Sequence, residues 1–357
     1  MGSWPWRELG FDEFVDTLED PVAAEGLSPL LGVPACLVHP PALPLSGLSH
    51  HAQARYESLA CVVVGAPGGW TGAERAIIDV IAPAADDGLA LDEPIDAIAK
   101  PIRDHPLAAA ALALLLRATE RHSINEGLHA ESAVYSVLQS GPEFATWLSG
   151  HRARRTEKPP VPDLSDQAAV LTERVDDQLV ITLNRPRKHN AFSRSIRDGL
   201  TEALAIASTD TELQIELRGA GPSFCSGGDL DEFGAFADPV TAHLTRLTRS
   251  PSRLLAALAE RTTVHLHGSC LGAGIELPAF AGRVIAHPDS RLGLPEIGLG
   301  LIPGAGGTVS LPRRIGRHRT ALLALTGTPI DAPTALAWGL IDAIADDFHK
   351  VDRNSRE

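Results

Sequence analysis

Cysteine is scarce in this sequence. Only four of its 357 residues are cysteines, at positions 36, 61, 225 and 270, and they form neither a CxxC pair nor another metal-binding spacing. This excludes a disulfide-stapled scaffold and favours a reducing compartment. We therefore expect a cytoplasmic protein without a metal site.

Positive charge and long apolar runs are also lacking. The formal net charge is −14, which excludes a general nucleic-acid binder because phosphate contacts need a basic surface. The most apolar run, at 107–116, follows Pro106 and predicts a buried helix, since it is far shorter than the roughly 20 residues that span a bilayer. The first residues, MGSWPWRELGFDEF, include acids where a signal peptide would be basic. Neither a membrane nor export is expected.

The composition supplies enough apolar material for two domains. Hydrophobic residues make up 44% of the chain and charged residues 21%, as in soluble globular proteins, and the length fits domains of about 150 residues. A charged, proline-rich stretch at 152–167 is typical of a linker. We predict a mainly helical N-terminal domain over 1–155, a linker over 156–167 and a second domain over 168–357.

The two predicted domains differ in their secondary-structure pattern. Upstream of the linker, 61–65 predicts one buried strand, and helices are predicted at 71–81, 106–121 and 127–147. Downstream, strands that are each followed by a turn and a helical pattern are predicted at 179–186, 213–219 and 262–268. This alternation is typical of βαβ units in the α/β fold class, whose ligands bind at the carboxyl ends of the strands. The chemistry is therefore expected in the loops of the second domain.

Two loops of the second domain are rich in glycine and other small residues. In GAGPSFCSGGDLDEF, Gly227 and Gly228 allow a sharp turn, and Asp229 can cap the helix that follows. In GSCLGAGIEL, the small residues at 272–274 expose amides at a helix N-terminus, where negative charge is favoured. If the two sets of amides converge on one point, they form an oxyanion hole.

Two glutamates stand in apolar surroundings in or near these loops. Glu276 lies in HGSCLGAGIEL and Glu296 in LGLPEIGLG. An apolar pocket raises the pKa of a carboxyl group, and two carboxyls in one pocket push one of them toward the protonated form. Such a pair can deprotonate water and return a proton elsewhere if a nearby carbonyl absorbs the developing charge. This is the chemistry of adding water across a conjugated double bond.

Four segments, in this order and spacing, resemble the crotonase (enoyl-CoA hydratase/isomerase) superfamily over about 169–344: ITLNRPRKHNAFS, GPSFCSGGDLDEF, GSCLGAGIEL and LPEIGLGLIPGAGGTVSLPRRIG. The resemblance implies a ββα-spiral fold and an acyl-CoA thioester as substrate. It implies that the amides of Gly228 and Ala273 bind the thioester oxygen. It further implies that Glu276 orients and activates water and that Glu296 protonates the α-carbon.

The resemblance also implies further substrate contacts. It places the CoA adenosine near the loop after the first strand of the second domain, where Arg187 and Lys188 are candidates for its phosphates. The other matched substrate-binding positions are Ala191, Gly227, Asp229 and Gly272. The expected enzyme is an enoyl-CoA hydratase, a lyase of fatty acid metabolism, which needs no metal and no cofactor beyond the CoA of its substrate.

Other functions stay open. Large extra N-terminal domains occur in crotonase relatives that oxidise arylacetyl-CoA without a cofactor, and a double-bond isomerase or a thioesterase is a further alternative, because side chains decide the fate of the enolate. Outside the superfamily, GSCLG fits the nucleophile elbow of an α/β-hydrolase, with Cys270, Asp331 and His349 as a triad. A non-catalytic scaffold is the remaining interpretation.

The resemblance bears on assembly as well. Family members continue past a segment like GLIDAI, here 339–344, with helices that cover the acyl pocket and help to build trimers, whereas only a short polar tail follows here. We expect a homo-oligomer, with a trimer or hexamer possible only through other contacts. The predicted helices at 106–121 and 127–147 are expected to dock where the missing helices would lie.

Overall fold

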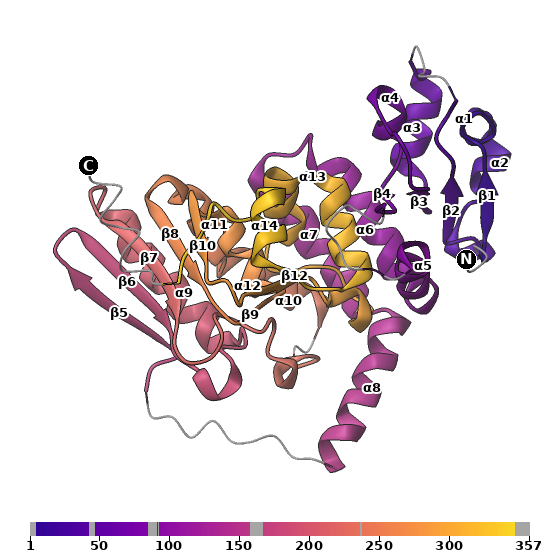
Figure 1. Cartoon of the computed structure of the whole chain (residues 1–357). Coiled ribbons are helices and arrows are strands. Elements are labelled where there is room, and N and C mark those ends of the chain that lie inside the picture. Colours follow the sequence, from indigo (N-terminus) through magenta and orange to yellow (C-terminus); the bar gives the residue numbers. More distant parts are fainter. Residues whose placement is uncertain are drawn as a thin grey trace.

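The computed structural model describes residues 5–42, 47–84, 91, 93–157, 167–235 and 238–346. Two α/β parts of the chain lie on opposite sides of one long helix, α13 (Gly307–Thr326), as Figure 1 shows. Most of the predicted linker at 156–167 lies outside the described residues. Among the described residues, none of the helices combines the length and apolar character that crossing a bilayer requires.

The first part of the chain forms a small parallel sheet with its own helices. Its strands follow one another in chain order: β1 (Arg7–Leu9), β2 (Ala35–Val38), β3 (Val62–Gly65) and β4 (Val80–Ile81). The helices around them are α1 (Phe11–Glu19), α2 (Pro21–Glu25), α3 (His50–Ser58) and α4 (Gly72–Ala76). Only β3 was predicted. The predicted helix at 71–81 is wrong beyond Ala76, because the chain turns there into β4.

Four further helices lead from this sheet toward α13. They are α5 (Pro94–Asp104), α6 (Pro106–Thr119), α7 (Ile124–Gln139) and α8 (Pro142–Glu157). Helix α6 confirms the prediction at 106–121. The predicted helix at 127–147 is wrong as a single element, because the chain breaks at Gly141 and a new helix begins at Pro142. Proline fits the first turn of a helix and disrupts its interior.

The second part contains a six-stranded sheet in the order β13-β10-β8-β7-β6-β5. Its strands are β5 (Val170–Val175), β6 (Gln178–Leu183), β7 (Gln214–Gly219), β8 (Thr262–Leu266), β10 (Arg283–Ala286) and β13 (Ala343–Ile344). Neighbours run parallel except in the β5–β6 hairpin. β6, β7 and β8 confirm the three predicted strands, and α9 (Arg194–Thr209) joins β6 to β7 as a βαβ unit.

A second, three-stranded sheet and several short helices complete this part. The sheet has the order β12-β11-β9 and consists of β9 (Ser269–Leu271), β11 (Arg291–Gly293) and β12 (Ile330–Asp331). The helices are α10 (Pro239–Thr248), α11 (Pro251–Ala257), α12 (Ala273–Glu276) and α14 (Ala332–Trp338). The parallel strands alternating with helices confirm the predicted α/β class of this part.

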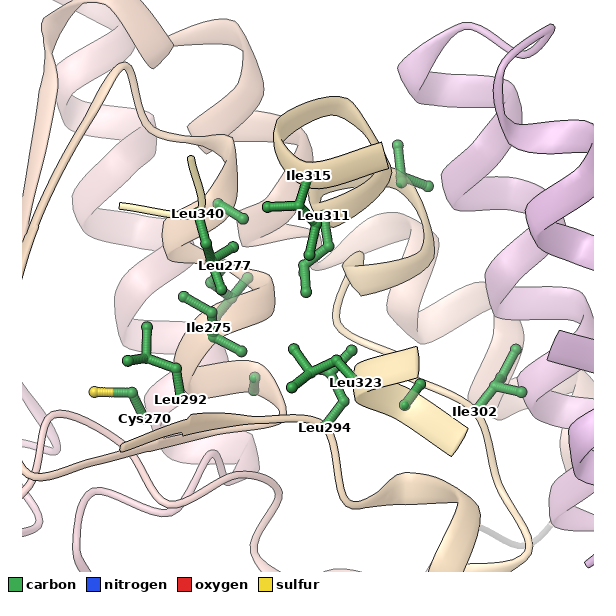
Figure 2. Close-up of a cluster of buried hydrophobic side chains, with 14 of the residues drawn as sticks. Cys270, Ile275, Leu277, Leu292, Leu294, Ile302, Leu311, Ile315, Leu323 and Leu340 are labelled. Carbon is green, nitrogen blue, oxygen red and sulfur yellow. The ribbon is translucent and has the colours of Figure 1, made fainter. Parts of the chain in front are cut away.

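Helix α13 joins the two parts of the molecule. Gly316, with a φ of 77°, kinks it and divides it into two helical segments. Leu311 and Ile315 of the first segment pack against Ile275 and Leu277 in a buried apolar cluster (Figure 2). The helices α5, α6 and α7 also pack against α13. The N-terminal helices therefore dock on the second half, and one hydrophobic core contains residues of both.

A buried cluster of charges also fastens α13 to the N-terminal sheet. Asp79 accepts hydrogen bonds of 2.8 and 2.6 Å from Arg117 of α6, and Arg317 of α13 lies 3.8 Å from it. The Tyr56 hydroxyl lies between them, donating to Asp79 at 2.7 Å and accepting from Arg317 at 3.0 Å. Burial alone would raise the pKa of Asp79, but the charges of Arg117 and Arg317 and the hydrogen bonds from Arg117 and the Val63 N–H lower it below its usual value.

Candidate active site

A cavity of about 310 Å³ lies next to the segment that leads into α13. Residues of the second half and of α7 line it together. The predicted site residues on its wall are Gly227, Gly228, Asp229, Ala273, Glu276 and Glu296. The structure thus brings both predicted glutamates and both predicted oxyanion-hole residues to one cavity.

The two small-residue loops lie side by side because the segments before them are paired. Cys225 and Cys270 form a parallel bridge, and the backbone of Cys225 makes hydrogen bonds of 3.2 and 3.0 Å to the second segment. Three residues beyond each cysteine lie Gly228 and Ala273. Within the described part of the chain, neither of their N–H groups has a hydrogen-bond acceptor. Two fixed, unused amides on one cavity wall have the chemistry of an oxyanion hole.

Glu296 begins the short helix η6 (Glu296–Leu299), and its carboxyl group is buried. The residue is 9% exposed, and its Oε2 has no hydrogen-bond partner among the described residues. Gly272, with a φ of 51°, makes room for it, because a Cβ there would lie 2.3 Å from Glu296 Oε1. Burial raises the pKa of Glu296 to about 8; its own backbone N–H opposes this and the Glu131 charge adds to it. A carboxyl group with this pKa holds a proton at neutral pH.

Glu276 is the last residue of α12, and it is 2% exposed. Its Oε2 accepts N–H bonds from Ala305 at 2.7 Å and Gly307 at 2.9 Å, at the start of α13. Burial, and then the charges of Glu296 and Glu131, raise the pKa of Glu276, while the two amides oppose that rise. The amides and the positive end of the helix stabilise a carboxylate. Of the two predicted glutamates, Glu276 is therefore the one whose carboxylate form has main-chain donors, whereas Glu296 Oε2 has no such partner among the described residues.

A third buried carboxyl group comes from the N-terminal half, and the sequence analysis missed it. Glu131 of α7 is 2% exposed and accepts N–H bonds from Gly306 at 2.7 Å and Thr308 at 2.9 Å. Burial raises the pKa of Glu131 to about 7, although these donors oppose it. The available signal was the spacing of Gly127, Glu131 and Tyr135, which puts the three on one face of a predicted helix.

Tyr135 and Arg246 also line the cavity without having been predicted. The Arg246 guanidinium carbon lies 4.8 Å from the centre of the Tyr135 ring. Arg246 donates to the Ser132 hydroxyl at 3.1 Å and to that of Ser136, which ties α10 to α7. Burial raises the pKa of Tyr135, so that its phenol is neutral at working pH. The N-terminal half therefore supplies part of the cavity wall.

Besides Gly272, three further predicted substrate-binding residues do not line the cavity. Lys188 is paired with Asp231 and lies 3.9 Å from Asp229. Arg187 is exposed and Ala191 is buried, and the CoA contacts of all three stay a prediction. Asp229 caps the following turn, as expected, by accepting the N–H of Asp231 at 3.2 Å.

The structure contradicts the hydrolase interpretation. Cys270 is 0% exposed and belongs to the apolar cluster of Figure 2, and its thiol donates to the carbonyl of His267 at 3.6 Å. Burial raises the pKa of this thiol, which removes the thiolate that a nucleophile needs. Asp331 instead caps α14 by accepting the N–H of Thr334 at 2.9 Å, and His349 lies outside the described residues. No group of three or more metal-ligating side chains occurs in the described part of the chain.

Known proteins match the second half of the chain. The family model for enoyl-CoA hydratase/isomerase matches residues 176–357. Enoyl-CoA isomerase/hydratase fer4 of Mycosarcoma maydis is 35% identical over 175 residues, which cover 46% of this chain and 64% of that protein. The 2,3-dehydroadipyl-CoA hydratase of Escherichia coli K12 is 34% identical over 176 residues, covering 49% and 68%. The crystal structure of enoyl-CoA hydratase from Thermoplasma volcanium GSS1 aligns with a TM-score of 0.48 and 32% identity, covering 53% and 77%. The chain thus spans about two thirds of the length of these two relatives.

Proposed function

The chain belongs to the enoyl-CoA hydratase/isomerase family, and from this membership and the site geometry we propose that it adds water across the 2,3 double bond of an acyl-CoA thioester. One observation carries the proposal. Two buried glutamates, Glu276 and Glu296, share a cavity with the unused amides of Gly228 and Ala273. That set contains a base, an acid and a stabiliser of negative charge.

The amides act on the thioester oxygen. When water attacks C3, the electron pair of the double bond moves through C2 to this oxygen and forms an enolate. The N–H groups of Gly228 and Ala273 stabilise the new charge, and the strand pairing behind them fixes both before the reaction begins. Because they are main-chain groups, they do not depend on the side chain at their own position; a Cβ at Gly228 would nevertheless lie 2.8 Å from the Phe233 ring.

The two glutamates move the protons. Glu276 reacts in its carboxylate form, which accepts the N–H groups of Ala305 and Gly307, and takes a proton from the water as the water oxygen bonds to C3. Glu296, which carries a proton at neutral pH because of its raised pKa, donates that proton to C2. The product has gained one water, and the two carboxyl groups have exchanged protonation states, which proton exchange with solvent restores.

The proposal extends to cofactors, location and assembly. Hydration involves no net oxidation, so it needs neither a redox cofactor nor a metal, and CoA is part of the substrate. We assign the protein to the cytoplasm because of its unpaired, buried cysteines. We assign it to a homo-oligomer on the family resemblance.

A panel of 2-enoyl, 3-enoyl, saturated and arylacetyl-CoA thioesters tests the reaction, with mass spectrometry of the products in the presence and absence of oxygen. We expect the 2-enoyl substrates alone to gain the mass of one water, independently of oxygen. A product of unchanged mass with a moved double bond indicates an isomerase, and free CoA without hydration indicates a thioesterase. Oxygen-dependent oxidation of the arylacetyl thioester indicates a dioxygenase. Any of these three in place of hydration overturns the proposal.

A further inference from the structure

One face of α7 lies against the segment that leads into α13. Gly127, Glu131 and Tyr135 are four residues apart and face this segment in turn. A Cβ on Gly127 would lie 2.9 Å from Val309, and a Cβ on Gly304 would lie 2.4 Å from the Tyr135 ring. This close packing holds Glu131 at the N-terminus of α13.

Four consecutive amides at this N-terminus alternate between two carboxyl groups. Glu276 accepts from Ala305 and Gly307, and Glu131 accepts from Gly306 and Thr308. The Thr308 hydroxyl donates a further bond of 2.7 Å to Glu131. The first amides of a helix have no acceptor within the helix. Each of the two carboxyl groups therefore accepts two of these four amides, and both lie at the positive end of the same helix dipole.

We propose that Glu131 is a positioning residue of the active site, which fixes the first turn of α13 and thereby the two amides that orient the Glu276 carboxylate. This role rests on the proposed hydration, in which Glu276 is the base. Glu131 does not line the main cavity but a smaller neighbouring one of about 50 Å³. It therefore acts through Glu276 and not on the substrate.

The charge of Glu131 changes the pKa of the neighbouring carboxyl groups, which a neutral helix cap would not do. The titratable and charged groups around it are Tyr135 on α7, Glu276 on α12, Glu296 on η6, His243 and Arg246 on α10, Arg249 after α10 and Arg197 on α9. The charge of Glu131 raises the pKa of both Glu276 and Glu296. Removing it lowers both pKa values, so both limbs of a bell-shaped pH profile move to lower pH. A purely structural cap would lower stability and leave both limbs in place.

The test is Glu131→Gln, assayed for hydration of a 2-enoyl-CoA across the pH range. Glutamine keeps the shape of the side chain, removes its charge and replaces one acceptor by a donor. We expect both limbs to move to lower pH by about half a unit or more. We also expect kcat to fall by about tenfold, with KM little changed, because the base is misoriented and substrate contacts are untouched.

Three further variants control this result. Glu126→Gln makes the same chemical change on the same helix at an exposed carboxyl group, and its pH profile should match the wild type. Glu131→Asp keeps the charge and should leave both limbs near their wild-type positions. Thr308→Val removes one donor to Glu131 and favours its protonated form, so a smaller shift in the same direction is expected. Wild-type limbs in Glu131→Gln, with only a lowered melting temperature, would reduce Glu131 to a helix cap and overturn the proposal.

Infrared titration of the protonated carboxyl bands separates this proposal from the hydration itself, because it needs no turnover. The bands of Glu276 and Glu296 are assigned by their loss in Glu276→Gln and Glu296→Gln. In Glu131→Gln both bands should titrate at lower pH than in the wild type. If Glu131→Gln does not fold, Thr308→Val takes its place. If no 2-enoyl-CoA is hydrated but these bands shift, hydration fails and the coupling of Glu131 to the pair stands. If hydration occurs and neither bands nor limbs move, the proposal for Glu131 fails alone.

Discussion

Two clusters of buried charge lie along α13, and they are built on opposite principles. Beyond the kink, Asp79 is matched by Arg117 and Arg317, with Tyr56 between them. At the N-terminus of the same helix, Glu131, Glu276 and Glu296 lie together, and the described salt bridges include none of them. Main-chain amides, not cations, hold two of the three.

The contrast separates a stabilising cluster from a reactive one. In the matched cluster, opposite charges lower the pKa of the carboxyl group and keep one protonation state. In the unmatched cluster, burial raises all three pKa values, to about 7 for Glu131 and about 8 for Glu296, and like charge adds to the rise for Glu276 and Glu296. Protons can therefore enter and leave near neutral pH, which is what acid–base catalysis needs.

The largest expected effect comes from neutralising the unmatched cluster. Glu296→Gln should reduce hydration by roughly 100- to 10,000-fold, because no group is left to protonate C2. Acyl-CoA binding, measured by calorimetry, should be retained, since the amides of Gly228 and Ala273 are untouched. The free energy of unfolding should stay the same or rise above pH 7. Glu260→Gln, at an exposed position, is the control, and comparable turnover in the two variants would contradict the role of Glu296.

Breaking the matched cluster should lower the stability of the protein and leave its activity unchanged. Asp79→Asn leaves two buried guanidinium groups without a carboxylate, which should lower the free energy of unfolding by about 3–5 kcal/mol in chemical denaturation. The folded fraction should keep its kcat. Asp104→Asn breaks the exposed pair with Lys100 and should cost less than about 1 kcal/mol. Equal costs for the two substitutions would show that the buried cluster does not secure α13.

The smallest effect is on the pH dependence of stability, where the two clusters should have opposite slopes. The folded pKa of Asp79 is lowered, so its stabilisation is present above its unfolded pKa and is lost as the pH falls through the folded value. The folded pKa values of Glu131 and Glu296 are raised, so their contribution is full below the unfolded pKa of about 4.3. It is lost as the pH rises through about 7 and about 8.

Unfolding curves from pH 4 to 9 should show this decline of stability with rising pH in the wild type. The decline should be smaller in Glu296→Gln, whereas Asp79→Asn should flatten the acid side only. If the free energy of unfolding of Glu296→Gln declined with rising pH as steeply as that of the wild type, the pKa of this carboxyl group would not be raised in the folded protein.

The sequence predicted those features that depend on neighbouring residues. Strands β6, β7 and β8 follow from short apolar runs bounded by turns, and α6 from the proline before an apolar stretch. The break between α7 and α8 was missed, although Gly141 and Pro142 signal it. The strands β1 and β4 are too short to produce a pattern, whereas β2 was missed although it is as long and as buried as β3. Glu131 was not predicted, because its role depends on a contact with residues about 175 positions away. The spacing of neighbouring residues carries no information about such a contact.

That contact has a consequence for the synthesis of the chain. Glu131 and Thr308 are 177 residues apart, so at 5–20 residues per second the ribosome makes α7 roughly 9 to 35 s before its partner helix. During this interval the apolar side of α6 and the face of α7 that carries Glu131 lack the surface that later covers them. A nascent chain in this state is a natural client for a chaperone, and slower translation should increase its aggregation.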